Sequence, residues 1–249
     1  GNEFTKENSI SRAIQFTLDK IYSPDDVGKD STLNNFYDSV KRRSSGIITS
    51  MGKSKLINEL YERFFKNAFP LTTQKLGIVY TPIEIVDFMI LSTQYLLDVE
   101  FNKKLSDKNI SILDPFTGTG TFINRLLSSK IFTPSQLKYK YENEIYANEI
   151  ILLAYYIATI NIESIYHSII KSNQYQPFNG SVLTDTFQLY EQERDLIADL
   201  LPDNSKKRTR QKKSPIKIII SNPPYSIGQK SENDNAQNIK YTNLDEKIR

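Results

Sequence analysis

Cysteine and tryptophan are absent from the 249 residues of this sequence, and histidine occurs once. The lack of cysteine excludes disulfide bonds and thiolate catalysis. With His167 as the sole imidazole, no zinc site of ordinary cysteine and histidine ligands can form, so we expect no metal chemistry. Since 39% of the residues are hydrophobic, the chain is long enough for one large domain, or for a domain with a helical extension.

Long hydrophobic runs are also missing. The longest apolar stretch, from Ile150 to Ile160, contains a threonine and two tyrosines, and it is shorter than the roughly 18 to 20 residues that span a bilayer. Residues 1–20 mix charged side chains such as Glu3 and Lys6 with apolar ones, unlike a signal peptide. We therefore expect no membrane partner and a cytoplasmic location.

Positive charge is concentrated in one short segment. The net charge of the chain is +3, yet six basic residues lie between positions 206 and 213, so the remainder carries a net charge of −3. They are Lys206, Lys207, Arg208, Arg210, Lys212 and Lys213. With Asn204, Ser205 and Ser214 beside it, the run predicts a solvated basic loop over residues 204–214. Such a loop also suits contact with phosphate groups.

The first 75 residues show only the periodicity of α-helices. Apolar residues recur at helical spacing within residues 10–21, 33–40 and 57–68, and no strand pattern competes with them. The segment at 51–54 resembles the end of a phosphate-binding loop, but Ile47 stands where that motif requires glycine, which excludes a nucleoside-triphosphate site. We interpret residues 1–75 as a helical N-terminal or coupling segment and residues 76–249 as a second unit.

A helix start follows at residues 80–85. Thr81 suits the N-cap position, Pro82 the first helical position and Glu84 the third. Tyr80 and Ile85 can form a hydrophobic staple around this start. The apolar face of the helix is predicted to hold Val86, Met89, Ile90 and Leu97.

From residue 110 onward, short apolar runs alternate with amphipathic helices, which is typical of an α/β domain with a largely parallel sheet. We predict strands at 110–113, 144–147, 181–183 and 216–220, and helices at 121–129 and 149–166. The strand at 216–220 is almost continuously apolar, so we expect it at the centre of the sheet, covered on both faces. The polar tail at residues 229–249 is expected to be flexible.

A glycine-rich turn joins the first strand to the helix after it. Glycines permit tight turning and close approach of a ligand to the backbone, and open α/β sheets place ligands at the carboxyl ends of their strands. A dinucleotide-binding fingerprint is absent, since Ile123 stands where its third glycine would be. The turn predicts a small-ligand site formed by Asp114, Pro115, Phe116, Thr117, Gly118, Thr119 and Gly120.

Acidic residues follow the next two strands. Glu149 could accept hydrogen bonds from two adjacent ribose hydroxyls, although Glu142 and Glu144 lie close by and a glutamate at a helix start has an electrostatic explanation of its own. Asp185, after the third strand, could accept a hydrogen bond from the exocyclic amine of an adenine, or could serve as an ordinary turn or cap residue. At this point both alternatives stay open.

The fourth strand leads into Ser221, Asn222, Pro223, Pro224 and Tyr225. Two consecutive prolines remove backbone donors and fix φ, so the chain leaves the strand stiffly, with carbonyl groups available to accept hydrogen bonds. The Asn222 side-chain oxygen, the Pro223 carbonyl and the Tyr225 ring together match a planar base that carries an exocyclic amine. This segment predicts a site for chemistry on a base.

These motifs resemble those of DNA amino-methyltransferases. DPFTGTG at residues 114–120 is similar to the cofactor motif of that family, and NPPY at 222–225 is similar to its catalytic motif. The order, with YTP at 80–82 first, resembles the gamma class of DNA adenine-N6 methyltransferases. More narrowly, the sequence from about residue 35 to 249 resembles the methylase region of single-polypeptide Type I (Type ISP) restriction-modification enzymes.

The resemblance implies a Rossmann-like core that binds S-adenosyl-L-methionine, preceded by an α-helical segment. The residues implied to bind this cofactor are Tyr80, Thr81, Pro82, Asp114 to Gly120, Glu149, Ile150 and Asp185. Thr81 would approach the methionine end, Glu149 would hold the ribose and Ile150 would pack on the adenine ring. Asp185 would accept from the adenine amine, with Thr184 and Thr186 as alternative contacts.

The implied reaction transfers a methyl group to N6 of an adenine that is flipped out of double-stranded DNA. The implied catalytic residues are Asn222, Pro223, Pro224 and Tyr225. Cytosine-N4 methylation uses the same chemistry and stays open, as do RNA or protein-glutamine methylation and a non-catalytic DNA-binding or interaction module.

In the Type ISP family, nuclease, helicase-like and target-recognition domains belong to the same polypeptide. The resemblance therefore implies that this chain is a truncated piece with an incomplete sheet. On that reading the full-length protein would bind the DNA, and the isolated chain is expected to be inactive.

Overall fold

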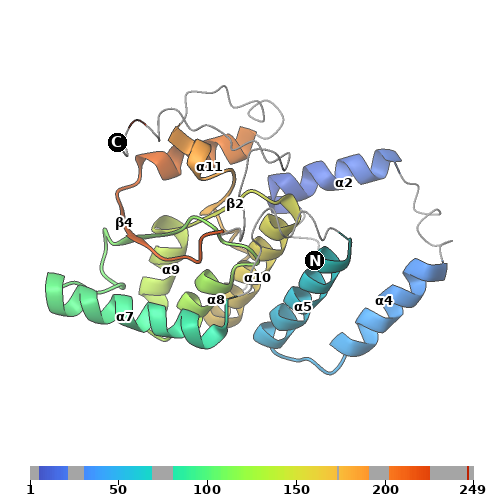
Figure 1. Ribbon diagram of the computed structural model, residues 1–249, viewed down its shortest axis with the longest axis horizontal. Helices are drawn as coiled ribbons and strands as arrows, with labels where there is room; N and C mark the ends of the chain where they lie inside the picture. The colour runs from blue at the N-terminus through green and yellow to red at the C-terminus, as the bar shows by residue number, and fades with distance from the viewer. Residues whose placement is uncertain are drawn as a thin grey trace, which may run out of the picture.

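The computed structural model describes residues 6–21, 31–68, 81–172, 174–190, 202–224 and 246. Tyr80 and Tyr225 lie outside the described residues, and so does the expected tail apart from Glu246. The described part forms a parallel sheet with helices on both faces, preceded by a group of helices (Figure 1). The expected α/β fold with a preceding helical segment is thus confirmed.

Four strands make up the sheet in the described part of the chain, and all neighbouring strands run parallel. They are β1 (Ser111–Asp114), β2 (Ile145–Glu149), β3 (Ser181–Leu183) and β4 (Ile216–Ile219), in the order β3-β2-β1-β4. The register pairs Asp114 with Ala147 and Glu149 with Leu183. Because the strands are parallel, their carboxyl ends lie along one edge of the sheet.

In the described sheet β4 lies at the edge and not at the expected centre, and it is partly uncovered, as an incomplete sheet implies. In the described sheet β4 pairs only with β1, and its side chains alternate in burial. Ile216 and Ile218 are half-buried, whereas Lys217 is exposed and Ile219 is 69% exposed. One face of β4 therefore packs on the core. Because Ile219 is apolar although it faces outward, the sequence does not show the alternation of apolar and polar residues that is typical of a strand buried on one face.

Four helices cover one face of the sheet, below it in Figure 1. They are α7 (Ile83–Phe101), α8 (Thr121–Ser128), α9 (Pro134–Asn143) and α10 (Leu152–Ile170). Their apolar side chains form one core with the sheet, in which Ile90, Ile112, Ile123 and Ile162 are almost fully buried. Burial of a side chain of this size contributes about 1.5 to 3 kcal/mol, so this layer holds the strand ends in place.

The predicted apolar face of α7 is confirmed, because Val86, Ile90 and Leu97 are buried and Met89 packs against the same core. α10 starts three residues later than expected. The reason is that Glu149 still belongs to β2 and its carboxylate accepts a hydrogen bond from Ile151 N at 2.8 Å.

Residues 204–214 were expected to form a basic loop, but most of them lie in a helix, α11 (Pro202–Lys213), on the other face of the sheet (Figure 1). Lysine, arginine and glutamine have good helix propensity, and buried polar side chains anchor the inner face. Asn204 donates to the Leu183 carbonyl and accepts from the Leu183 amide, each at 2.9 Å. Gln211 Nε2 donates to Asn148 Oδ1 at 2.8 Å.

Only part of the basic charge on α11 faces solvent. Arg208 and Arg210 donate to the main-chain carbonyls of Gln188 and Glu142. The basic side chains that are exposed are Lys206, Lys212 and Lys213.

The N-terminal segment contains α2 (Ser9–Ile21), α4 (Ser31–Ser44) and α5 (Ser50–Ala68), which confirms its helical periodicity. α5 packs on α10, where Tyr61 and Ala154 share a small apolar cluster. Gly52 lies in the first turn of α5, so the segment that resembles a phosphate-binding loop is helical. Among the described helices, none has the length and apolar character needed to cross a membrane.

Candidate active site

The carboxyl edge of the sheet brings together parts of the chain that are far apart in the sequence. Asp114 ends β1, Glu149 ends β2, and Ser221 and Asn222 follow β4. Ser221 Oγ donates to Asp114 Oδ1 at 2.6 Å, and Gly118 N donates to Glu149 Oε2 at 2.8 Å. The glycine turn, the acidic strand end and the proline segment therefore form one site.

Asp114 is fully buried, and its two carboxylate oxygens differ in their surroundings. Oδ1 accepts from Ser221 Oγ and from Phe116 N, the latter at 3.2 Å. Oδ2 is buried and has no hydrogen-bond partner among the described residues. Burial raises the pKa of Asp114 to about 7, because desolvation disfavours the charged form. A buried acceptor without a donor suits a ligand that brings its own donor.

Both glycines of the turn adopt a left-handed backbone, with φ of 57° at Gly118 and 90° at Gly120. A Cβ on Gly120 would lie 3.3 Å from both Cα and O of Ala158 in α10, whereas a Cβ on Gly118 would meet nothing within 4 Å. Gly120 is thus required by both its backbone and its close packing on α10. Gly118 is required by its backbone alone.

Glu149 holds the turn against the start of α10. Its Oε2 accepts from Gly118 N and its Oε1 from Ile151 N, each at 2.8 Å. Burial raises the pKa of Glu149, and the hydrogen bonds from the main chain oppose that shift. Each oxygen keeps a further lone pair that could accept from a ligand hydroxyl.

Glu142 and Glu144, the sequence neighbours that compete with Glu149, lie elsewhere. Glu144 precedes β2 and accepts from Lys140 Nζ and from Asn109 N, each at 2.6 Å. Glu142 belongs to α9. Both sit beyond the amino end of β2, at the opposite end of the strand from the glycine turn.

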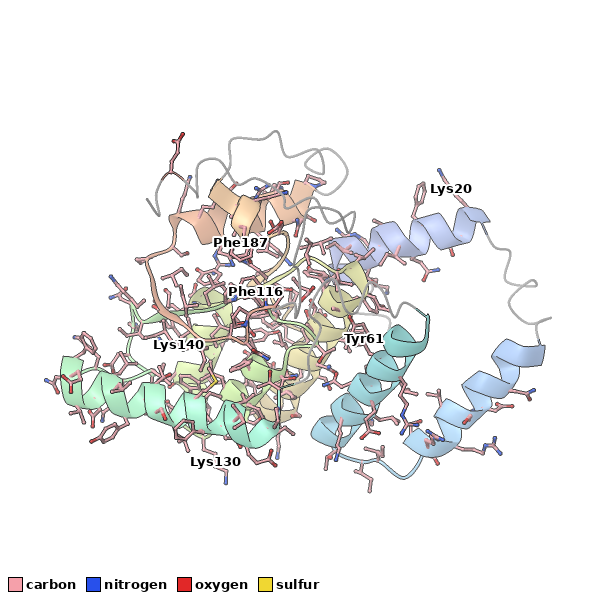
Figure 2. All side chains as sticks on the ribbon, viewed as in Figure 1. Lys20, Tyr61, Phe116, Lys130, Lys140 and Phe187 are labelled. Carbon is pink, nitrogen blue, oxygen red and sulfur yellow. The ribbon has the colours of Figure 1, made fainter. Side chains whose placement is uncertain are left out.

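Apolar surface surrounds these carboxylates. Ile150 follows Glu149 directly and is 55% exposed. Phe187, 40% exposed, begins a short 3₁₀ helix (Phe187–Tyr190), and its ring centroid lies 5.4 Å from that of Phe116. In Figure 2 the labels of Phe187 and Phe116 lie one below the other, under the helix that Figure 1 labels α11. Exposed apolar side chains beside buried polar ones are typical of a ligand site.

Asp185 and Thr186 have clear structural roles in the connection after β3. Asp185 Oδ1 accepts from Phe187 N at 2.9 Å, which matches the interpretation as a turn aspartate. Thr186 Oγ1 donates to the Pro115 carbonyl at 2.6 Å and accepts from Asn148 Nδ2 at 3.2 Å. Thr186 thereby ties this connection to the DPF segment.

Asn222 contacts the start of α7. Its Nδ2 donates to Thr81 Oγ1 at 3.0 Å, and both residues are half-buried. Thr81 was expected to cap the helix, but the N-cap is Pro82, which has no side-chain cap. The prediction was off by one residue, since the Pro82 carbonyl accepts from the amides of Ile85 and Val86, each at 3.1 Å. Pro223 and Pro224 follow and are exposed.

The family described as N-6 DNA Methylase matches residues 52–247. The chain belongs to the N-6 DNA methylase family. No curated protein sequence matches it.

Three solved structures are similar to this chain. The DrdV–DNA complex has a TM-score of 0.88 and 35% identity. A nuclease-deletion mutant of the Type ISP restriction-modification enzyme LlaGI, in complex with a DNA substrate mimic, has a TM-score of 0.83 and 41% identity. The ATP-dependent Type ISP restriction-modification enzyme LlaBIII, bound to DNA, has a TM-score of 0.82 and 42% identity. In the same order, the matches cover 99, 98 and 96% of this chain. This chain spans only 24, 20 and 16% of the length of those three chains.

Phe187 and the contact of Ser221 with Asp114 were not predicted from the sequence. Phe187 could have been noticed, because it lies two residues after Asp185, itself a candidate site residue. The contact of Ser221 with Asp114 had no local signal. No group of three or more histidine, aspartate or glutamate side chains suited to a metal ion occurs in the ranges that the structure describes.

Proposed function

We propose that this chain forms the cofactor site and the catalytic motif of an S-adenosylmethionine-dependent DNA methyltransferase that acts on adenine N6 in a restriction-modification system. The observation that carries the proposal is one sheet edge where the unpartnered oxygen of Asp114, the carboxylate of Glu149 and the segment at Asn222 meet. DNA is the proposed substrate because the similar structures are DNA complexes.

The residues fit this cofactor. Asp114 Oδ2 would accept from the ammonium group of the methionine moiety, which would remove the cost of about 1 to 3 kcal/mol of a buried acceptor without a donor. Glu149 would accept from the ribose hydroxyls. Ile150 and Phe187 would pack on the adenine ring, and Asp185 would accept from its amine. When bound, the cofactor supplies an electrophilic methyl group on a sulfonium.

Asn222 and Pro223 would prepare the target amine. Their oxygens accept its hydrogens, which draws the nitrogen lone pair out of conjugation with the ring and stabilises the positive charge that develops on nitrogen. They hold the nitrogen while the C–N bond forms and the C–S bond breaks, with the electron pair left on sulfur. The surplus proton then passes from nitrogen to solvent. Tyr225 would stack on the base, which contributes about 1 to 3 kcal/mol.

DNA sequence recognition would reside outside this chain. Because the chain spans at most 24% of the similar polypeptides, nuclease, helicase-like and target-recognition parts would belong to a complete gene product. The isolated chain would not methylate a defined DNA sequence.

Cofactor binding is the first test. Equilibrium dialysis of radiolabelled S-adenosylmethionine against the chain is expected to show binding that Glu149→Ala weakens by about 3- to 10-fold, since hydrogen bonds to ribose are lost. Glu142→Ala, at the other end of β2, is the matched control and should not change the dissociation constant. Absence of binding at millimolar cofactor, both to the chain and to the complete gene product, would overturn the cofactor assignment.

Methylation is the second test. In the complete gene product, Asn222→Ala is expected to abolish methyl transfer while cofactor affinity stays the same, because the proposed partner of Asn222 is the target amine. Mass spectrometry of the digested DNA identifies the product. N6-methyladenine supports the proposal, whereas N4-methylcytosine would replace adenine by cytosine as the target.

A further inference from the structure

We propose that α5, in the N-terminal helical segment, is a positioning element of the cofactor site and acts on the glycine turn through Asn161. This inference rests on the proposed function, because it assumes that the turn from Asp114 to Gly120 binds the cofactor. It assigns a role to a helix that precedes the turn by about fifty residues.

The first link is a shared hydrogen-bond donor. Asn161 lies in α10 with 1% of its surface exposed. Its Nδ2 donates to the Thr119 carbonyl at 3.2 Å and to Asn58 Oδ1 at 3.1 Å. An amide nitrogen carries two hydrogens, so these two acceptors use both of them. Asn58 of α5 therefore fixes the amide that holds the turn.

Thr119 is the position where such a restraint matters. It lies between Gly118 and Gly120, which both have positive φ, and glycine allows the backbone on each side more conformations than any other residue does. The Thr119 carbonyl is held by a side chain whose orientation depends on α5. Loss of Asn58 would leave the amide of Asn161 less constrained and the turn less ordered.

The second link reaches the other end of the site. Tyr61 lies one helical turn after Asn58 and is 5% exposed. It packs with Ala154 and Ile157 of α10 and with Ile151, which directly precedes α10. Burial, and to a lesser extent the charge of Glu149, raises the pKa of the Tyr61 hydroxyl. Tyr61 thus lies beside the segment whose Ile151 amide donates to Glu149. α5 supports both the turn and the proposed ribose carboxylate.

Coupling of this kind is reciprocal. If α5 orders the turn for the cofactor, then bound cofactor must strengthen the docking of α5 on α10 by the same free energy. The N-terminal helices and the cofactor site would therefore sense each other, without any residue of α5 having to touch the cofactor.

The test uses three variants of the 249-residue chain and the cofactor itself. Asn58→Leu removes the acceptor at similar volume, and it is expected to weaken S-adenosylmethionine binding in equilibrium dialysis by about 3- to 10-fold. Asn58→Asp keeps an oxygen acceptor, and Glu59→Ala changes an exposed neighbour on the same helix. Both controls should bind within about twofold of the unmodified chain.

A second measurement compares the unmodified chain with Asn58→Leu. Hydrogen exchange followed by mass spectrometry is expected to show that cofactor slows amide exchange in α5 around Asn58 as well as in the glycine turn, and that Asn58→Leu abolishes the effect on α5. Protection of the turn without protection of α5 in the unmodified chain would overturn the inference. So would a Glu149→Ala chain with weakened binding beside an Asn58→Leu chain with normal binding, and that result would leave the proposed function standing.

Discussion

The carboxyl group of Asp114 is fully buried, and desolvation raises its pKa from the ordinary value of 3.8 to about 7. In the proposed site only the charged form can pair with an ammonium group. A raised pKa means that the charged fraction of the free protein falls as the pH drops below about 7. Cofactor binding must then be linked to loss of a proton, and affinity must rise with pH.

We predict that the affinity of the chain for S-adenosylmethionine rises by about three- to tenfold between about pH 6 and pH 8. Asp114→Asn should bind weakly throughout and lose most of this rise. Burial also raises the pKa of Glu149, so Glu149→Gln is the comparison variant. Its affinity for the cofactor should still rise with pH to the extent that ionisation of Asp114 causes the rise. Equilibrium dialysis across a pH series measures this, and a flat profile for the unmodified chain would contradict it.

Thr81 is the second residue with a testable role. Its hydroxyl accepts from Asn222 Nδ2, so this contact uses the amide nitrogen of Asn222 and leaves Oδ1 as the atom proposed to accept from a target amine. Thr81→Val keeps the volume but removes the acceptor, so the amide can turn over. We predict that single-turnover methylation by the complete gene product slows by about tenfold, equivalent to about 1.4 kcal/mol in the barrier, with unchanged cofactor affinity.

Thr81→Ser keeps the hydroxyl and is the matched control for this prediction. It should methylate at close to the normal rate. If Thr81→Val weakened cofactor binding and left the rate of the bound complex unchanged, Thr81 would act at the methionine end of the cofactor, as the family resemblance implies.

Among the structural elements, the glycine turn and α10 depend most closely on each other. Alanine at Gly118 must adopt a left-handed backbone, which costs about 1 to 2 kcal/mol. Alanine at Gly120 has the same strain and also crowds the backbone of Ala158 at 3.3 Å. We predict that Gly120→Ala lowers the free energy of unfolding by about 1 to 3 kcal/mol more than Gly118→Ala does.

Urea denaturation of the two glycine variants and the unmodified chain measures this difference. Equal losses for the two variants would show that α10 yields to the added methyl group, and that the turn is not tightly packed on it.

At the scale of the whole molecule, one helix presents a group of exposed basic side chains. α11 lies across the sheet from α7, α8 and α9 (Figure 1), and Lys206, Lys212 and Lys213 face solvent there. A DNA complex of the complete gene product could use this helix to contact phosphates. The arginines of α11 that bind main-chain carbonyls are less available for that purpose.

We predict that glutamine at Lys206, Lys212 and Lys213 together makes DNA binding by the complete gene product less dependent on salt. Each lysine that contacts a phosphate adds about 0.9 to the slope of log affinity against log salt concentration. The slope should therefore decrease by about 1 to 3. Replacing the exposed Lys103 and Lys104, which follow α7, is the control, and an unchanged slope in the triple variant would make α11 a solvated surface only.

Local pattern alone determined much of this protein. The four strands lie within two residues of their predicted positions, and the same pattern identifies Asp114, Glu149 and Asn222 at or just after the strand ends. This works because strand burial, turn chemistry and helix starts depend on residues a few positions apart. The same reasoning missed the helix at α11, since the buried contacts of Asn204 and Gln211 are made to other elements.

The tertiary structure decided how those residues act together. Thr81 and Asn222 are 141 positions apart, Ser221 and Asp114 are 107 apart, and Asn58 and Asn161 are 103 apart. No periodicity spans such separations, so these hydrogen bonds follow only from the packing of the helices on the sheet. The pairing of β4 with β1 has the same origin, because an apolar run does not specify which strand lies beside it.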